Sequence, residues 1–378
     1  MARSSIRDQM RSCRAQVLIA AVFLSCGVFA IDEAFVGTAD AREPVVGHYH
    51  RSGSASQAAQ VDPQVGAVIE KMAAAGVLHP ATVDEIRKAY LFYPTLSGKP
   101  EDVLHVEDRV IPGPGVTIPI RIYTPSGRRG LPLLVFFHGG GFVAGSLDTY
   151  DTPLRSVASR CNCIVASVAY RLAPENPYPA GVNDAYAATE WIADHAAEMN
   201  SDPRLIAVAG DGAGGNIAAL VTLMAKNRGG PRLVFQVLIY PMIDQAITRQ
   251  SRYISGDPAL TPEGRALVLR AYVPLTQNLE DPYISPIFAE SLRGLPPALI
   301  VTDEDDPSPD EGDAYANQLA DDGVQVRVSR YPNMIHGFFL MGGVLDAGQK
   351  VIEEIADALK HAFRSAPESA AVRPEQRQ

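Results

Sequence analysis

The amino-acid sequence predicts an α/β protein in which helices flank a mostly parallel central sheet. Continuous apolar runs of strand length, such as residues 133–137 and 164–168, are typical of strands buried on both faces. Helical patterns separate these runs, so that strands and helices alternate along the chain. With 378 residues, the chain is long enough for one large domain of this class with an appended cap.

The sheet domain is predicted over residues 101–364. Its first strand alternates apolar and polar residues, as an exposed edge strand does, and the later strands are more continuously apolar. The predicted strands lie at 116–123, 133–137, 164–168, 205–209, 234–239, 298–301 and 324–328. The predicted helices lie at 150–160, 182–199, 214–227, 310–321 and 344–364. Residues 365–378 are predicted to be a disordered tail.

Two regions outside this alternation are predicted to form a helical cap. Residues 42–100 hold a polar lead-in, followed by helical patterns at 63–75 and 82–92. Residues 243–286 are rich in proline, glycine and polar residues around a helix at 262–272. An insertion of this kind between a strand and a helix is typical of a lid over a site.

The N-terminus has the pattern of an export signal. Arginines up to residue 14 precede an apolar run at 17–31, which is too short to span a membrane comfortably. An Ala-x-Ala site predicts cleavage after Ala41, with Ala30 as the alternative, so residues 1–41 are interpreted as a signal peptide. We therefore expect a periplasmic or secreted protein. The alternative is a retained N-terminal anchor, which would be its only membrane contact.

Composition excludes several function classes. The net charge is −10 and there is no long basic run, so nothing indicates binding to nucleic acid. Of the four cysteines, only Cys161 and Cys163 lie beyond the signal peptide. They are two apart at the start of a predicted strand, where both would point to one face, and we expect buried thiols rather than a disulfide. No residue spacing predicts a metal site or a cofactor.

A glycine-rich loop follows the predicted strand at 133–137. The sequence His138-Gly139-Gly140-Gly141-Phe142 lets backbone N–H groups turn toward one point without Cβ obstruction. Such a loop can hold an oxyanion. The alternative at this stage is a plain glycine-rich turn.

A second loop, GDGAGGN at 210–216, follows the strand at 205–209 and opens a helix directly. Its spacing is that of a nucleophile elbow, G-x-S-x-G, with Gly212 at the serine position. Glycine adopts the elbow's unusual backbone conformation without strain, so we expect the turn to persist. Asp211 cannot replace the serine, because its side chain would point away from the apex.

Two further segments follow later strands. An acidic run, Thr302-Asp303-Glu304-Asp305-Asp306-Pro307, comes after the strand at 298–301. The segment YPNMIHGF, at 331–338, contains His336. The order of elbow, then acid, then histidine is that of serine hydrolases on an α/β sheet.

Together with YRLAPE at 170–175, these motifs resemble the hormone-sensitive-lipase family of α/β-hydrolase-fold esterases over roughly residues 103–364. The resemblance implies that the N–H groups of Gly140, Gly141 and Ala213 form the oxyanion hole. It also implies that His336 is the catalytic base. The family's acid run matches Asp306, and Asp305 is the competing choice.

The resemblance implies a small-molecule ester as the ligand and no cofactor, and an edge strand of the sheet would allow a homodimer. Because Gly212 has no attacking oxygen, we expect weakened or altered ester chemistry, in which water replaces the serine. One alternative is a non-hydrolytic acid–base enzyme that uses His336 for an elimination, cyclisation or isomerisation. The other is a ligand-binding pseudoenzyme on the same fold.

Overall fold

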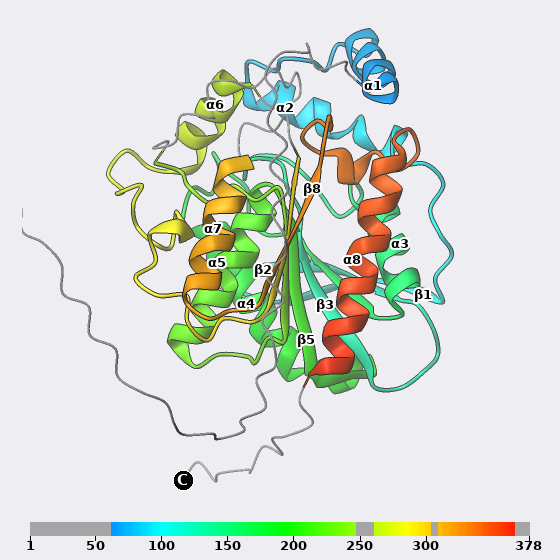
Figure 1. Ribbon diagram of the computed structural model, residues 1–378, viewed down its shortest axis with the longest axis vertical. Helices are drawn as coiled ribbons and strands as arrows, with labels where there is room; N and C mark the ends of the chain where they lie inside the picture. The colour runs from blue at the N-terminus through cyan, green and yellow to red at the C-terminus, as the bar shows by residue number, and fades with distance from the viewer. Residues whose placement is uncertain (1–61, 247–260, 304–308, 367–378) are drawn as a thin grey trace, which may run out of the picture. The chain divides into compact units, whose positions relative to one another are not determined.

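The computed structural model describes residues 62–246, 261–303 and 309–366 (Figure 1). The predicted signal peptide and lead-in, the middle of the cap insertion and the predicted tail from residue 367 onwards lie outside the described residues. Among the described helices, none is long and apolar enough to cross a membrane.

The described strands form a single eight-stranded sheet with the order β1-β2-β4-β3-β5-β6-β7-β8. Its first two strands are antiparallel to their neighbours, and all pairs from β4 to β8 are parallel. The predicted mostly parallel sheet is therefore confirmed. The strands are β1 (His105–Pro112), β2 (Thr117–Thr124), β3 (Leu131–Phe137), β4 (Ile164–Val168), β5 (Ser201–Asp211), β6 (Phe235–Ile239), β7 (Ala298–Asp303) and β8 (Val326–Tyr331).

Helices cover both faces of this sheet (Figure 1). Alternate residues of β3 lie in two separate apolar clusters, with Leu133 and Val135 in one and Leu134 and Phe136 in the other. The first cluster includes α4, α5, α6 and α7, and the second includes α1, α3 and α8. The helices are α1 (Pro63–Ala74), α2 (Val83–Tyr90), α3 (Asp151–Cys161), α4 (Ala180–Asp194), α5 (Ala213–Arg228), α6 (Pro262–Tyr272), α7 (Pro309–Asp321) and α8 (Asp346–Ser365).

The edges of the sheet differ most from the sequence-based prediction. The strand β1 was not predicted, because its residues include Glu107, Asp108 and Arg109 and only Ile111 is buried. It pairs with β2 through its backbone, which needs no apolar run. At the other edge, β8 begins two residues later than predicted, at Val326, and is half-exposed along its length.

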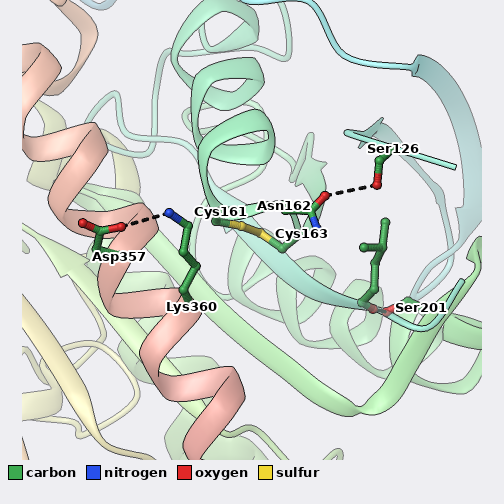
Figure 2. The surroundings of a disulfide bond; sticks show 8 residues. Ser126, Cys161, Asn162, Cys163, Ser201, Asp357 and Lys360 are labelled. Atoms are coloured by element: carbon green, nitrogen blue, oxygen red, sulfur yellow. Dashed lines mark hydrogen bonds and ion pairs between the residues drawn. A yellow bond between two sulfur atoms is a disulfide. The ribbon is translucent and has the colours of Figure 1, made fainter. Parts of the chain in front are cut away.

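The expectation of free thiols is wrong, because Cys161 and Cys163 form a disulfide (Figure 2). Cys161 is the last residue of α3, and Asn162 adopts a left-handed conformation with φ 51°. The chain therefore reverses between the two cysteines, which do not share one face of a strand. Their Cα atoms are 5.3 Å apart, within the usual range for a disulfide.

Candidate active site

The turn between β5 and α5 carries Gly212, at the nucleophile position of the elbow. Gly212 has φ 51° and ψ −113°, a conformation that side-chain-bearing residues rarely adopt. Its N–H donates to the carbonyl of Ile239 at 2.9 Å, and its carbonyl accepts from the N–H of Met242 at 3.1 Å. These contacts come from the backbone alone, so the elbow forms without a side chain at residue 212.

His336 follows β8, and its imidazole faces the elbow. A Cβ built on Gly212 would lie 3.1 Å from Nε2 and 3.5 Å from Cε1 of His336. Apart from the two chain neighbours, no other described atom lies within 4 Å of that point. The imidazole also packs against the ring of Tyr240, with centroids 4.6 Å apart. The structure thus brings together the two residues that the sequence assigned to nucleophile position and base.

The acidic run begins where β7 ends. Asp303 is the last residue of β7 and is fully buried. Asp305 and Asp306 belong to residues 304–308, which lie outside the described residues, and α7 begins at Pro309. The assignment of Asp306 as the acid that accompanies His336, with Asp305 as the competing choice, therefore stays a prediction.

The glycine-rich loop after β3 lies against the elbow. Gly140 and Gly141 have φ values of 114° and 59°, which favour glycine. The buried carboxylate of Asp211 holds the loop in place, accepting from the Gly139 N–H at 2.7 Å and the Tyr150 hydroxyl at 2.9 Å. Burial raises the pKa of Asp211 to about 6, although the hydrogen bond from Tyr150 opposes this shift.

Two neighbouring residues complete this region. Ala213 is the first residue of α5, so its N–H is one of those that a helix leaves without an intrahelical acceptor. His138 is buried, and its Nδ1–H donates to the carbonyl of Gly139 at 2.8 Å. Burial lowers the pKa of His138 to about 4, so it stays neutral and supports the loop. Its ring stacks on Tyr170, with centroids 4.4 Å apart.

A pocket of about 50 Å³ lies beside His336. Its polar groups come from the glycine-rich loop, the imidazole and two tyrosines, and the rest of its lining is apolar. The lining residues are Met72, Val77, Pro80, Ile86, Ala89, Tyr90, Tyr93, Gly140, Gly141, Met242, Gly264, Val268 and His336. Helices α1, α2 and α6 therefore supply most of its wall, and the loop and His336 supply its chemical groups.

Arg87 connects helix α2, which lines the pocket, to the rest of the protein. Its guanidinium donates to the carbonyls of Val143 and Ala173, at 2.9 and 3.1 Å, and to both oxygens of Glu175. Val143 follows the glycine-rich loop, and Glu175 ends the YRLAPE segment. One side chain thus joins the pocket wall to two of the motifs found in the sequence.

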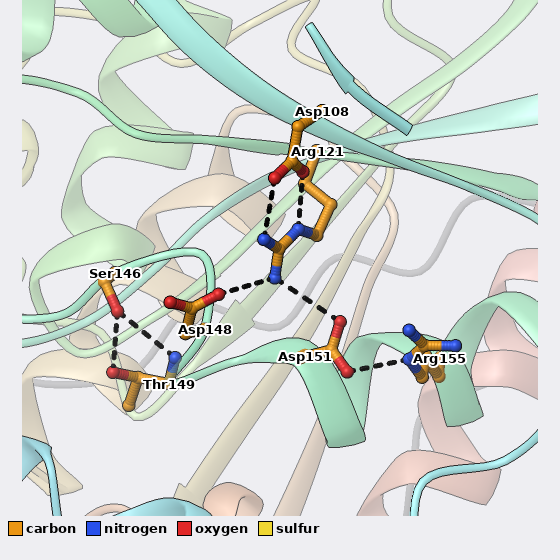
Figure 3. Close-up of polar contacts among 7 residues, drawn as sticks. All are labelled: Asp108, Arg121, Ser146, Asp148, Thr149, Asp151 and Arg155. Atoms are coloured by element: carbon orange, nitrogen blue, oxygen red, sulfur yellow. Dashed lines mark hydrogen bonds and ion pairs between the residues drawn. The ribbon is translucent and has the colours of Figure 1, made fainter. Parts of the chain in front are cut away.

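A second hollow, of about 510 Å³, is lined mostly by charged side chains, and Figure 3 shows the contacts among them. Arg121 of β2 pairs there with Asp108 at 2.6 Å, with Asp148 at 2.8 Å and with Asp151 at 3.5 Å. Arg155 pairs with Asp151 at 2.7 Å. These charges satisfy one another and connect the edge strands to α3, so we interpret the cluster as structural. Among the described residues, no group of three or more His, Cys, Asp or Glu side chains could hold a metal ion.

The sequence did not single out several residues that line the pocket or pack against His336. Tyr90 and Tyr93 come from the end of α2 and the turn after it, and Tyr240 follows β6. Of these, only Tyr90 lies in the helical pattern at 82–92, and that pattern gave no indication that Tyr90 would line the pocket. Tyr240 directly follows a buried strand, a position that could have singled it out.

The fold and the arrangement of elbow, glycine-rich loop and histidine define an α/β hydrolase. A family model described as the α/β hydrolase fold matches residues 134–340. The chain is 41% identical to carboxylesterase NlhH of Mycobacterium tuberculosis over 268 residues, covering 69% of this chain and 84% of the relative. It is 39% identical to esterase LipI of the same organism, covering 74% and 88% of the two chains.

A solved esterase from the archaeon Pyrobaculum calidifontis has a similar structure, with a TM-score of 0.75 and 39% identity. The match covers 80% of this chain and 98% of the archaeal one. The chain therefore belongs to the hormone-sensitive-lipase type of the α/β-hydrolase family, as its motifs predict.

Proposed function

We propose that the protein binds small acyl esters beside His336 and hydrolyses them slowly, with water in place of a serine nucleophile. The observation that carries this proposal is the 3.1 Å between Nε2 of His336 and the Cβ position of Gly212. A base at this distance from the elbow is placed to take a proton from an oxygen near its apex. Water at that point would attack an ester carbonyl directly.

The other roles follow from the family resemblance. The N–H groups of Gly140, Gly141 and Ala213 stabilise the oxyanion, and Asp306 orients His336. No acyl-enzyme forms, because Gly212 offers no oxygen to carry the acyl group. Hydrolysis then runs as an addition followed by an elimination. Water gives a proton to His336 and adds to the carbonyl, which forms the oxyanion. The C–O bond to the alcohol then breaks, and the alcohol takes the proton from His336.

The expected rate is low. Serine hydrolases that have lost a triad residue retain about 10³–10⁴-fold acceleration over water, from the oxyanion hole and substrate binding. The narrow, mostly apolar pocket beside His336 supports small acyl esters as ligands. Carboxylesterases among the relatives support esters as the class.

The test compares turnover of p-nitrophenyl acetate by the wild-type protein and by His336→Ala. We expect slow, steady turnover by the wild type that His336→Ala lowers further, toward the rate that the oxyanion hole and binding alone support, with both proteins folded. Saturable ester binding without turnover would favour the pseudoenzyme. Equal turnover by both proteins would rule out His336 as the base.

We also propose that the protein is exported. The arginine-rich start and the short apolar run support a signal peptide. The Cys161–Cys163 disulfide adds support, because disulfides persist mainly in oxidising compartments.

A further inference from the structure

A buried ion pair joins the helix that lines the pocket to the helix that follows the acidic run. Nη2 of Arg265, on α6, lies 2.8 Å from Oε1 of Glu311, in the first turn of α7. The two side chains are only 4% and 0% exposed. Taking two charges out of water is costly, and a well-packed apolar pair is often as stable. The pair is therefore better explained by the arrangement it fixes than by added stability.

The ion pair also holds the start of the cap insertion. The second carboxylate oxygen of Glu311 accepts from the N–H of Asp244 at 2.8 Å. Nη2 of Arg265 also donates to the carbonyl of Asp244 at 3.2 Å. Three segments that are distant in the sequence thus meet at these two side chains.

Asn216 of the elbow motif holds both ends of the same insertion. Its Nδ2 donates to the carbonyl of Met242 at 2.8 Å and to that of Ile284 at 3.0 Å. The ends of the insertion are therefore fixed by the elbow helix. The Arg265–Glu311 pair adds a contact from the helix between them.

The position of α6 determines how far the pocket extends. Gly264 and Val268, on either side of Arg265, both line the pocket with His336. Side-chain atoms of Val268 lie 2.7 to 3.2 Å from the point where a Cβ on Gly141 would be. Val268 therefore packs directly against the backbone of the glycine-rich loop, and closes the pocket there.

We propose that the Arg265–Glu311 pair determines ligand size, by holding α6 where Val268 closes the pocket against Gly141. Neither charged residue lines the pocket, so both are positioning residues that act through Val268. The inference rests on the proposed function, because it assumes that esters bind in this pocket. The inference adds that the Arg265–Glu311 contact, outside the pocket, limits the chain length of the ligands that bind.

The test uses methyl ketones from butan-2-one to decan-2-one, which carry the carbonyl of an ester but cannot be hydrolysed. Their dissociation constants are measured from the rise in melting temperature with ketone concentration. The main variant is Arg265→Met/Glu311→Leu, which removes both charges of the pair together. We expect wild type to prefer the short ketones, and the ratio of long-chain to short-chain affinity to rise at least tenfold in this variant.

Three further variants separate positioning from general loosening. Val268→Ala opens the wall directly and should shift the preference in the same direction. Arg265→Lys should keep the wild-type preference, because a single nitrogen makes both the Glu311 and the Asp244 contacts. Arg160→Met/Glu101→Leu removes a part-buried ion pair between α3 and the chain before β1, and should leave the preference unchanged.

If the Arg265→Met/Glu311→Leu variant does not fold, Glu311→Gln replaces it, since the amide oxygen can still accept from Asp244. The inference fails if a folded variant of the ion pair keeps the wild-type preference for short ketones while Val268→Ala changes it. The proposed function would then still stand. If no ketone raises the melting temperature of wild type, the proposed ester binding fails and the inference fails with it.

Discussion

Nε2 of His336 lies 3.1 Å from the point at which a side chain on Gly212 would begin. The backbone at Gly212 is held by Ile239 and Met242, through contacts that any residue at this position could make. The imidazole thus faces the position that the side chain of a serine at residue 212 would occupy. What separates the protein from a conventional esterase can therefore be tested at a single residue.

Gly212→Ser should raise ester hydrolysis by at least about 10²-fold, because restoring a complete triad is worth about 10⁶ in rate elsewhere. The positive φ of 51° opposes a side chain, at a cost of about 1–3 kcal/mol. The measurement is hydrolysis of p-nitrophenyl acetate and butyrate, with a fluorophosphonate probe for covalent labelling.

The matched control for that variant is Gly212→Ser/His336→Ala, which has the hydroxyl without its base and should neither label nor accelerate. A folded Gly212→Ser protein that behaves like this control would show that the pocket has diverged beyond its nucleophile. Wild-type activity already equal to that of an ordinary esterase would mean that residue 212 is not the nucleophile position.

The buried carboxyl of Asp211 should make stability depend on pH. Burial raises its pKa from 3.8 to about 6, so the folded protein binds more protons than the unfolded chain between these values. The contribution of this group to the free energy of unfolding is therefore complete below about pH 4. It falls by roughly 3 kcal/mol as pH rises through 6. Urea unfolding at pH 4.5 and pH 7 measures the effect.

Asp211→Asn is the control for that pH dependence. An amide oxygen can still accept from Gly139, and its NH₂ can donate to Tyr150, but the side chain no longer titrates. The unfolding free energy at pH 7 minus that at pH 4.5 should be more positive in Asp211→Asn than in wild type. An unchanged difference would show that another group carries the pH dependence.

Reduction of the Cys161–Cys163 disulfide should lower stability only slightly. The bond closes a loop of three residues, for which chain entropy predicts about 1–2 kcal/mol. The melting temperature of wild type should fall by a few degrees in reducing agent, and that of Cys161→Ala/Cys163→Ala should not respond. Free thiols at both positions in protein purified from the exported fraction would contradict the bond.

Export should remove the N-terminus after Ala41, with Ala30 as the alternative site. Mass spectrometry of the periplasmic or secreted protein gives the new N-terminus directly. Replacing Ala39 and Ala41 with arginine should block cleavage at the first site. A mature species that still begins at Met1 would instead support a membrane anchor.

The sequence predicted the parts of this fold that depend on buried strands. The continuous apolar run at 164–168, for example, forms β4 with the predicted bounds, because a strand buried on both faces is apolar throughout. Edge strands have a weaker apolar pattern, which is why β1 was not predicted and β8 begins later than predicted. The disulfide was missed because it depends on a left-handed residue, Asn162, that no local pattern announced.

The candidate site was predictable to a similar degree. Motif order placed Gly212, His336 and the glycine-rich loop at one edge of the sheet, since parallel strands end there together. The walls were not predictable, because Tyr93 and Val268 reach the pocket from segments with no shared motif, and the Arg265–Glu311 pair lies outside it. Packing between distant segments decides such contacts, and a single sequence carries no signal of it.

Arg87 connects α2, which lines the pocket, to the loops that contain Val143 and Ala173. Arg87→Ala removes its hydrogen bonds to the carbonyls of Val143 and Ala173 as well as its pair with Glu175. We expect a loss of about 1–2 kcal/mol in unfolding free energy, since hydrogen bonds from a charged group are worth about 1.5–3 kcal/mol and this side chain is partly exposed. Ester KM should rise more than kcat falls, because α2 lines the pocket but carries neither His336 nor the glycine-rich loop. Glu175→Gln is the matched control, since it weakens only the ion pair with an exposed carboxylate and should leave the unfolding free energy nearly unchanged. If both variants lost the same stability, the ion pair would be what holds α2, and the carbonyl contacts would be incidental.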